Sequence, residues 1–190
     1  MHIKITIYVL LCGGLIALLS GCKKEYKLDE ITNKGIILSL DEMLFYPEHL
    51  RDTVFKPQYK YVVYVDSVDC SPCKVIHMGI WNYYRNRLLD YNAGFYMIFS
   101  PPKEQVRTLL ETHSTYKHRI PIYIDTTGVF KRDNPQITER TTDLHCFLLD
   151  ENNKILVFGD ASTKHHVRDE IFNILSEKYD SITIKGTKTY

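Results

Sequence analysis

The chain has 190 residues, with 24 Lys and Arg against 23 Asp and Glu. This balance excludes a strongly basic chain, so charge gives no reason to expect nucleic acid or a polybasic membrane patch as a partner. The 14 tyrosines argue against a disordered chain and suit a globular protein that contains strands.

The N-terminus has the layout of an export signal. A short positive segment ending at Lys4 precedes an apolar run over residues 5–19, and the small residues Ser20 and Gly21 precede Cys22. The run is short for a membrane span, which needs about 20 apolar residues. An uncleaved anchor helix is the alternative. We predict that residues 1–21 are a signal peptide and that Cys22 is the lipid attachment residue.

Residues 19–22, Leu-Ser-Gly-Cys, are similar to the bacterial lipobox, and this resemblance implies a diacylglycerol on the Cys22 sulfur. Two or three lipid chains would make such anchoring stable. We therefore expect a lipid-anchored protein of the cell envelope, on the periplasmic face of the outer membrane. Removal of residues 1–21 from the 190-residue chain leaves 169 residues, which suits one domain.

From Cys22 onward, residues 22–34 are charged and weakly periodic and predict a tether, and residues 35–190 predict one α/β domain.

Within the predicted domain, apolar runs typical of buried strands alternate with segments of helical spacing, and the last two runs flank a turn at residues 151–154. Strands are expected at residues 36–38, 61–65, 95–99, 120–125, 146–150, 155–158 and 182–184. Helices are expected from residue 72 to about 90, over 103–113 and over 163–179, and residues 129–141 are expected to form a short helix or a loop. This order predicts a central mixed sheet with helices on both faces and a C-terminal antiparallel hairpin.

The five cysteines separate by position. Cys12 leaves with the signal, Cys22 is acylated, Cys70 and Cys73 form a C-x-x-C pair, and Cys146 stands alone in a predicted strand. An exported compartment permits disulfides. Cys146 has the spacing of a small core residue, and a role as a partner of Cys70 is the alternative.

The C-x-x-C pair lies between a buried strand and an amphipathic helix, which is typical of a redox motif. Cys70 is expected at the helix start, where unpaired N–H groups and the helix dipole favour the thiolate that attacks disulfides. Cys73, about one turn later, would resolve the mixed disulfide. Pro72 fits the first helical turn and stiffens the loop between the cysteines.

On these residues the chain resembles the thioredoxin superfamily. The strand at residues 61–65, the motif at 70–73 and the hairpin at 147–155 carry the resemblance, and the hairpin is similar to that of membrane-anchored TlpA-type thioredoxins and of peroxiredoxins. The resemblance spans about residues 35–179. It implies a thioredoxin-like fold and a thiol–disulfide oxidoreductase that acts without a cofactor.

Three positions depart from the family pattern. The family's cis-proline aligns with Leu144, and Pro121 is expected to precede an additional strand instead. Asp69 stands where an aromatic residue commonly precedes the first cysteine, and its carboxylate disfavours the thiolate of Cys70. The buried acid of thioredoxins aligns near Tyr64. These departures predict a slow or specialised redox protein.

The function expected is thiol–disulfide exchange, with Cys70 as nucleophile, Cys73 as resolving cysteine and Pro72 between them. Its partners would be exported proteins with thiols or disulfides, and a redox donor or acceptor; neither a metal nor nucleic acid is required. Two alternatives remain. The pair could be an inert disulfide on a binding lipoprotein, or Cys70, Cys73 and His77 could hold a metal, since they offer soft ligands on one helical face.

Overall fold

The structure is a computed structural model that describes residues 35–53, 57–67, 69–116, 120–138 and 145–186. The predicted signal peptide, Cys22 and the predicted tether lie outside these residues. Within the described residues, no helix is both long enough and apolar enough to cross a membrane.

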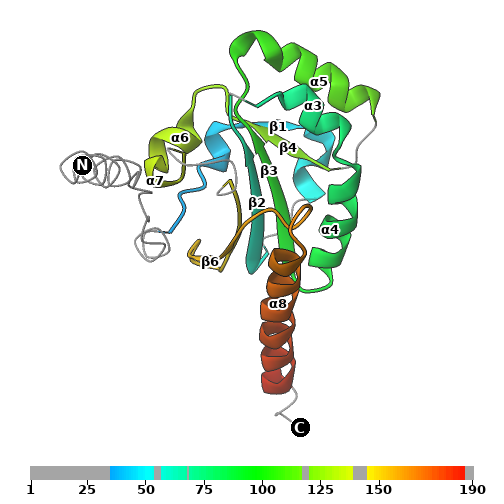
Figure 1. Ribbon diagram of the computed structural model, residues 1–190, viewed down its shortest axis with the longest axis vertical. Coiled ribbons are helices and arrows are strands. Elements are labelled where there is room, and N and C mark those ends of the chain that lie inside the picture. Colours follow the sequence, from blue (N-terminus) through cyan, green and yellow to red (C-terminus); the bar gives the residue numbers. More distant parts are fainter. Residues whose placement is uncertain (1–34, 54–56, 68, 117–119, 139–144, 187–190) are drawn as a thin grey trace, which may run out of the picture.

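A six-stranded mixed sheet forms the centre of the domain (Figure 1). Its strands are β1 (Leu44–Tyr46), β2 (Tyr59–Val65), β3 (Ala93–Phe99), β4 (Ile122–Ile124), β5 (Cys146–Leu149) and β6 (Ile155–Phe158), in the order β1-β4-β3-β2-β5-β6. Strands β2, β3 and β4 are parallel, whereas β1 is antiparallel to β4 and β5 is antiparallel to both β2 and β6. The expected mixed sheet with a C-terminal antiparallel hairpin is confirmed.

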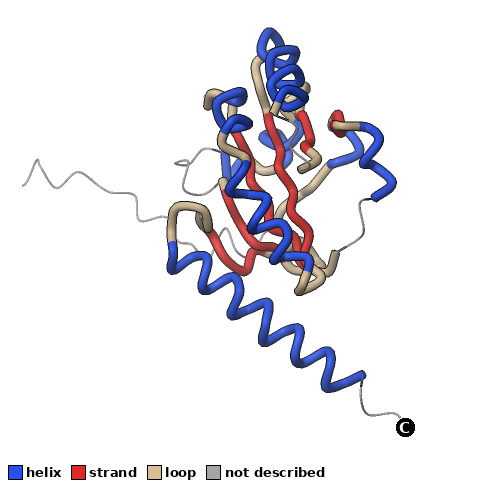
Figure 2. Tube along the Cα trace, turned by 90° about the vertical axis from the view of Figure 1, so that its right-hand side faces the viewer, coloured by secondary structure: helices blue, strands red, loops and turns tan. Residues whose placement is uncertain are grey.

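Helices cover both faces of this sheet, as predicted (Figures 1 and 2). The helices are α3 (Ser71–Ile76), α4 (Gly79–Leu89), α5 (Val106–Thr115), α6 (Val129–Asp133), α7 (Pro135–Thr138) and α8 (His165–Gly186). Short 3-10 turns occupy Leu40–Glu42, Glu48–Thr53 and Lys103–Gln105. One core contains buried side chains of α3, α4, α5 and α8, and a second core on the opposite face contains those of α6, α7 and the N-terminal segment.

Two predicted strands are absent. Residues 36–38 form no strand, because the side-chain amide of Asn134 pairs with both the N–H and the C=O of Ile37. The edge strand forms instead at Leu44–Tyr46, where Phe45 pairs with Tyr123 of β4. Residues 182–184 continue helix α8, which runs to Gly186 and extends past the sheet (Figure 2).

The helix predicted after the cysteines is interrupted at His77 and Met78, between α3 and α4. The interruption changes which side of the helix faces the sheet. Of the apolar residues at helical spacing in this segment, Tyr84 and Leu88 are buried. By contrast, Ile76, Ile80 and Tyr83 are 41%, 47% and 57% exposed. The helical face that is actually buried consists of Val75, Met78, Trp81, Tyr84 and Leu88.

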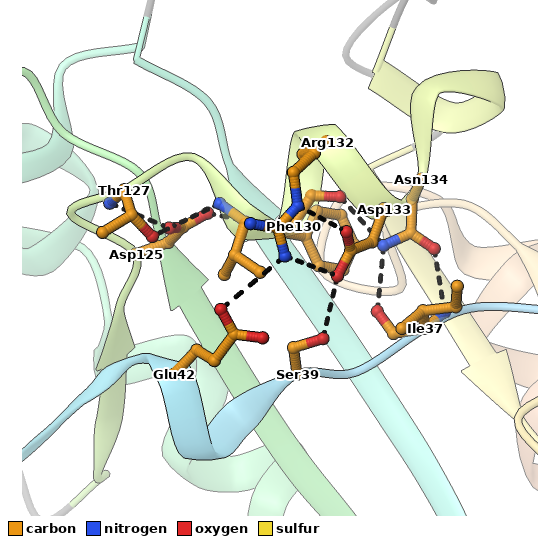
Figure 3. A network of polar contacts seen from close by, with 10 residues as sticks. Ile37, Ser39, Glu42, Asp125, Thr127, Phe130, Arg132, Asp133 and Asn134 are labelled. Atoms are coloured by element: carbon orange, nitrogen blue, oxygen red, sulfur yellow. Dashed lines mark hydrogen bonds and ion pairs between the residues drawn. The ribbon is translucent and has the colours of Figure 1, made fainter.

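A polar network fastens the N-terminal segment to α6 and α7 (Figure 3). Asn134, which is fully buried, donates from Nδ2 to the Ile37 carbonyl at 2.9 Å and accepts from the Ile37 N–H at Oδ1 at 2.8 Å. Ser39 Oγ donates to Asp133 Oδ2 at 2.9 Å. The first described segment of the chain is therefore held by these side-chain hydrogen bonds and by the backbone bond from the Ile36 N–H to the Asn153 carbonyl, at 2.8 Å, rather than by a strand ladder.

Candidate active site

Cys70 and Cys73 are joined by a disulfide at the start of helix α3, with their Cα atoms 5.2 Å apart. Cys70 is the N-cap residue, and its carbonyl accepts the helical N–H of Lys74 at 3.0 Å. Pro72 is in the first turn of α3, as predicted. Both cysteines are exposed, so a reacting partner can reach the disulfide from solvent.

The position of the pair follows from the strand before it. Strand β2 is buried along nearly its whole length and ends at Val65, and the chain then turns so that the Asp69 N–H donates to the Asp66 carbonyl at 3.0 Å. This turn places Cys70 just beyond the carboxyl end of β2, one of the two middle strands of the sheet. Ligand and active sites of α/β sheets typically lie at such ends.

A pocket of about 310 Å³ opens beside the disulfide motif. Asp69 and Lys74, which flank the two cysteines in the chain, both line it. The remaining lining comes from the ends of β2 and β5, from β3, from His77 after α3, from α4, and from the loop between β6 and α8. The pocket thus combines apolar side chains such as Ile80, Trp81 and Met97 with polar ones such as Asp69 and Lys74.

His145 lines this pocket immediately before β5, and its side chain is only 4% exposed. Within the described part of the chain neither of its ring nitrogens has a hydrogen-bond partner. Its ring meets the Tyr64 ring edge to face, with the centroids 5.4 Å apart. Burial lowers the pKa of His145 from its ordinary 6.5, and Lys131 lowers it further, whereas the carboxylates of Asp66 and Asp69 oppose this shift.

Tyr64 stands where the sequence alignment placed the buried acid of thioredoxins. It is 2% exposed, and its ring stacks on Phe130 of α6 with the centroids 4.4 Å apart. Burial raises the pKa of Tyr64 to about 12, so the phenol stays neutral at physiological pH. Tyr64 therefore cannot supply the negative charge of a carboxylate.

The other cysteine, Cys146, is 6% exposed and belongs to the core on the α3–α4 face, as predicted for a small inward-facing strand residue. It also lines the pocket. Pro121 precedes β4 in a trans peptide, and β3 separates β4 from β2, so Pro121 belongs to the additional strand as expected. Leu144, aligned with the family's cis-proline, lies outside the described residues.

The metal alternative finds no ready-made site in this oxidised form. His77 is exposed at the end of α3, and the two cysteines are joined to each other. Among the residues that the structure describes, no three His, Cys, Asp or Glu side chains are grouped so that they could hold a metal ion.

Sequence reasoning did not place the loop after β6 at the site. Asp160, Ser162 and Thr163 of this loop line the pocket, and Asp160 Oδ1 shapes the loop by accepting from the Ser162 N–H at 2.8 Å. Tyr61 of strand β2 ties this loop to the sheet. Its hydroxyl donates to the Gly159 carbonyl at 2.9 Å and accepts from the Ala161 N–H at 3.0 Å. In the sequence, the only indication that Asp160, Ser162 and Thr163 belong to the site is that they directly follow the predicted hairpin.

No protein-family model matches the chain, and no curated protein matches its sequence. Among solved structures it is similar to a thioredoxin-like protein in the oxidised form, with 16% identity over 65% of this chain and 85% of that chain and a TM-score of 0.45. It is also similar to the exposed lipoprotein thioredoxin Etrx1 of Streptococcus pneumoniae strain TIGR4, with 16% identity over 65% of this chain and 87% of that chain and a TM-score of 0.42.

A third similar structure is the thioredoxin domain of the thiol-disulfide oxidoreductase BVU-2223 of Bacteroides vulgatus. The identity is 18% over 60% of this chain and 79% of that chain, and the TM-score is 0.40. All three TM-scores lie below 0.5.

Proposed function

We propose that the protein is a thiol–disulfide oxidoreductase of the cell envelope in which Cys70 is the nucleophile and Cys73 the resolving cysteine. The observation that carries this proposal is the exposed Cys70–Cys73 disulfide at the N-terminus of α3, beyond the carboxyl end of strand β2. A disulfide that served only to brace the fold would gain nothing from exposure beside a pocket.

The roles of the two cysteines follow from their places in the helix. In the reduced protein Cys70 caps α3, where the unpaired N–H groups and the positive end of the helix dipole stabilise a thiolate. The thiolate attacks a partner disulfide, a sulfur–sulfur bond forms between Cys70 and the partner, and one partner thiolate leaves. Cys73 then attacks Cys70, which restores the Cys70–Cys73 disulfide and releases the second partner thiol.

Run in reverse, the same steps reduce the Cys70–Cys73 disulfide and oxidise a partner dithiol. The partners proposed are exported proteins with thiols or disulfides, and a second redox protein that resets the cysteine pair. Pro72 stiffens the turn between the cysteines, and no cofactor takes part in the exchange. Cys22 carries the lipid that anchors the domain, on the periplasmic face of the outer membrane.

The test is to remove the resolving cysteine and trap the intermediate. Cys73→Ala, expressed with its lipid anchor, is expected to accumulate disulfide-linked adducts with exported proteins, and reductant should dissolve them. The pair Cys70→Ala/Cys73→Ala should form none, whereas Cys73→Ala/Cys146→Ala should still form them, because the buried Cys146 takes no part. Non-reducing gels followed by mass spectrometry of the linked peptides would identify the cysteine involved.

A folded, lipidated Cys73→Ala protein without adducts would favour a binding lipoprotein with an inert disulfide. Adducts that persist in Cys70→Ala/Cys73→Ala and vanish with Cys146→Ala would move the nucleophile to Cys146. One equivalent of metal co-purifying with the reduced protein, and lost in Cys70→Ser, would instead favour the metal-carrying variant.

A further inference from the structure

The resolving step needs a base. A thiol must lose its proton before it can attack, and an ordinary cysteine with a pKa near 8.5 is mostly protonated at neutral pH. Cys70 has the helix N-terminus to stabilise its thiolate, but Cys73 is the third residue of α3, one turn inside that N-terminus. The chain must therefore offer Cys73 a proton acceptor if resolution is to be fast near pH 7.

His145 is a buried imidazole with an unused lone pair. It lines the same pocket as Asp69 and Lys74, the residues next to Cys70 and Cys73, and neither of its ring nitrogens is bonded to any described residue. Buried polar atoms in native proteins are nearly always paired, so two ring nitrogens without partners in the pocket next to the disulfide motif need an explanation. A general base can also act through one bridging water.

The charges around His145 suit a base that is neutral at rest and charged only briefly. Burial keeps the resting ring neutral because it disfavours the imidazolium. The carboxylates of Asp66 and Asp69, which follow β2, attract the imidazolium once it forms, and Lys131 of α6 opposes them. Tyr64, which touches the ring edge to face, stays neutral and does not compete for the proton.

We propose that His145 is the proton acceptor of the resolving step, an inference that rests on the function proposed above. In that step Cys73 attacks the Cys70 sulfur, the Cys70–partner bond breaks, and its electron pair leaves with the partner sulfur. The proton lost by Cys73 passes to His145 and from there to the departing partner thiolate. No oxidant is consumed beyond the partner disulfide, and the imidazole ends the cycle neutral.

The test follows the decay of a defined mixed disulfide. The reduced protein is mixed with oxidised glutathione, acid-quenched at intervals and analysed by mass spectrometry, which separates the Cys70–glutathione species from the internal disulfide. Wild type and His145→Gln are compared from about pH 5.5 to about pH 9.5, a range that spans the ordinary pKa values of His and Cys. His166→Gln, an exposed imidazole of α8, is the matched control.

Near pH 7 the His145→Gln mixed disulfide is expected to decay at least about tenfold more slowly, since general bases contribute about 10²–10⁴-fold. The difference should close toward about pH 9.5, where the Cys73 thiol ionises without help. His166→Gln should follow the wild type throughout. Equal decay rates of the two proteins at pH 7 would overturn the proposal. A decay rate of His145→Gln that is lower by the same factor at every pH would also overturn it, because that pattern indicates a structural defect rather than a lost base.

The outcomes also separate the two proposals. A wild-type protein that never forms or resolves the mixed disulfide defeats the proposed function and this inference with it, whereas normal wild-type exchange with an unaffected His145→Gln defeats only the role of His145. If His145→Gln does not fold, the ring of His145 is titrated by NMR in the wild type. Its midpoint should differ between the disulfide and dithiol forms, and identical midpoints would reject the coupling.

Discussion

Asp125 allows a quantitative test of what stabilises helix α6. Its side chain is 1% exposed and directly follows β4. Oδ1 accepts the N–H groups of Thr127 at 3.2 Å and Val129 at 2.9 Å, and Oδ2 accepts that of Phe130 at 2.9 Å (Figure 3). One carboxylate therefore satisfies the backbone donors that begin helix α6.

The expected cost of Asp125→Ala follows from these three bonds. Loss of a single capping side chain destabilises proteins by about 0.5–2 kcal/mol, and unpaired buried donors add to this, so we expect about 3–4 kcal/mol. Asp125→Asn retains one acceptor oxygen but turns an amide donor toward one of the former N–H partners, and we expect about 1–2 kcal/mol. Glu111→Ala, which breaks an exposed ion pair with Arg107, should cost less than about 1 kcal/mol.

The assay is equilibrium urea unfolding of the disulfide form, followed by circular dichroism and fluorescence. Phe130 stacks on Tyr64, so the aromatic signal of Asp125→Ala should change together with its midpoint. If Asp125→Ala costs no more than Glu111→Ala, or if Asp125→Asn costs as much as Asp125→Ala, the count of hydrogen bonds does not explain the stability of α6.

Three further predictions concern other parts of the chain. Tyr61→Phe removes the hydroxyl that joins Gly159 and Ala161, and urea unfolding should show a loss of about 1–3 kcal/mol because both backbone groups stay buried without it. The pKa of His145 is lowered on folding, so the unfolded chain takes up its proton first as the pH falls. The neutral His145 ring therefore contributes fully to the free energy of unfolding above about pH 6.5, and this contribution is lost as the pH falls below that value. The free energy of unfolding should fall more for the wild type than for His145→Gln between about pH 7 and about pH 5, and an equal or smaller fall would contradict the direction of the pKa shift. Cys22→Ser should block lipidation and leave a larger precursor, and labelled lipid that still enters this variant would reject Cys22 as the attachment site.

The parts of the fold that the sequence predicted well are those with strong local signals. Strand β2 has an unbroken apolar run, the cysteines stand at a strand–helix junction, and the turn before β6 begins with Asp150, whose Oδ1 accepts the N–H groups of Asn152 and Lys154. Each of these signals lies within a few residues of the feature that it predicts. The same holds for Cys146, whose burial follows from its place in an apolar strand.

The parts that were missed depend on distant partners. Strand β1 exists because Phe45 pairs with Tyr123, and the segment before it is held by Asn134 instead of by a strand, which no local pattern around Ile37 reveals. A short interruption after α3 shifted the helical phase and exposed Ile80, a change that periodicity within a single predicted helix could not show. His145 was visible in the sequence, but its isolation from hydrogen-bond partners appears only when the strands are assembled.

If Cys22 carries the proposed lipid, the attachment of Ile37 to Asn134 limits how far the domain can lie from the membrane. With the chain fixed at Ile37, 15 residue steps separate it from Cys22, which allows an excursion of at most about 50 Å at full extension. The disulfide could not reach partners that lie farther from the bilayer surface than this distance and the breadth of the domain combined. On the proposed function, lengthening or shortening residues 23–34 would therefore change which partner proteins the disulfide can reach without altering its chemistry.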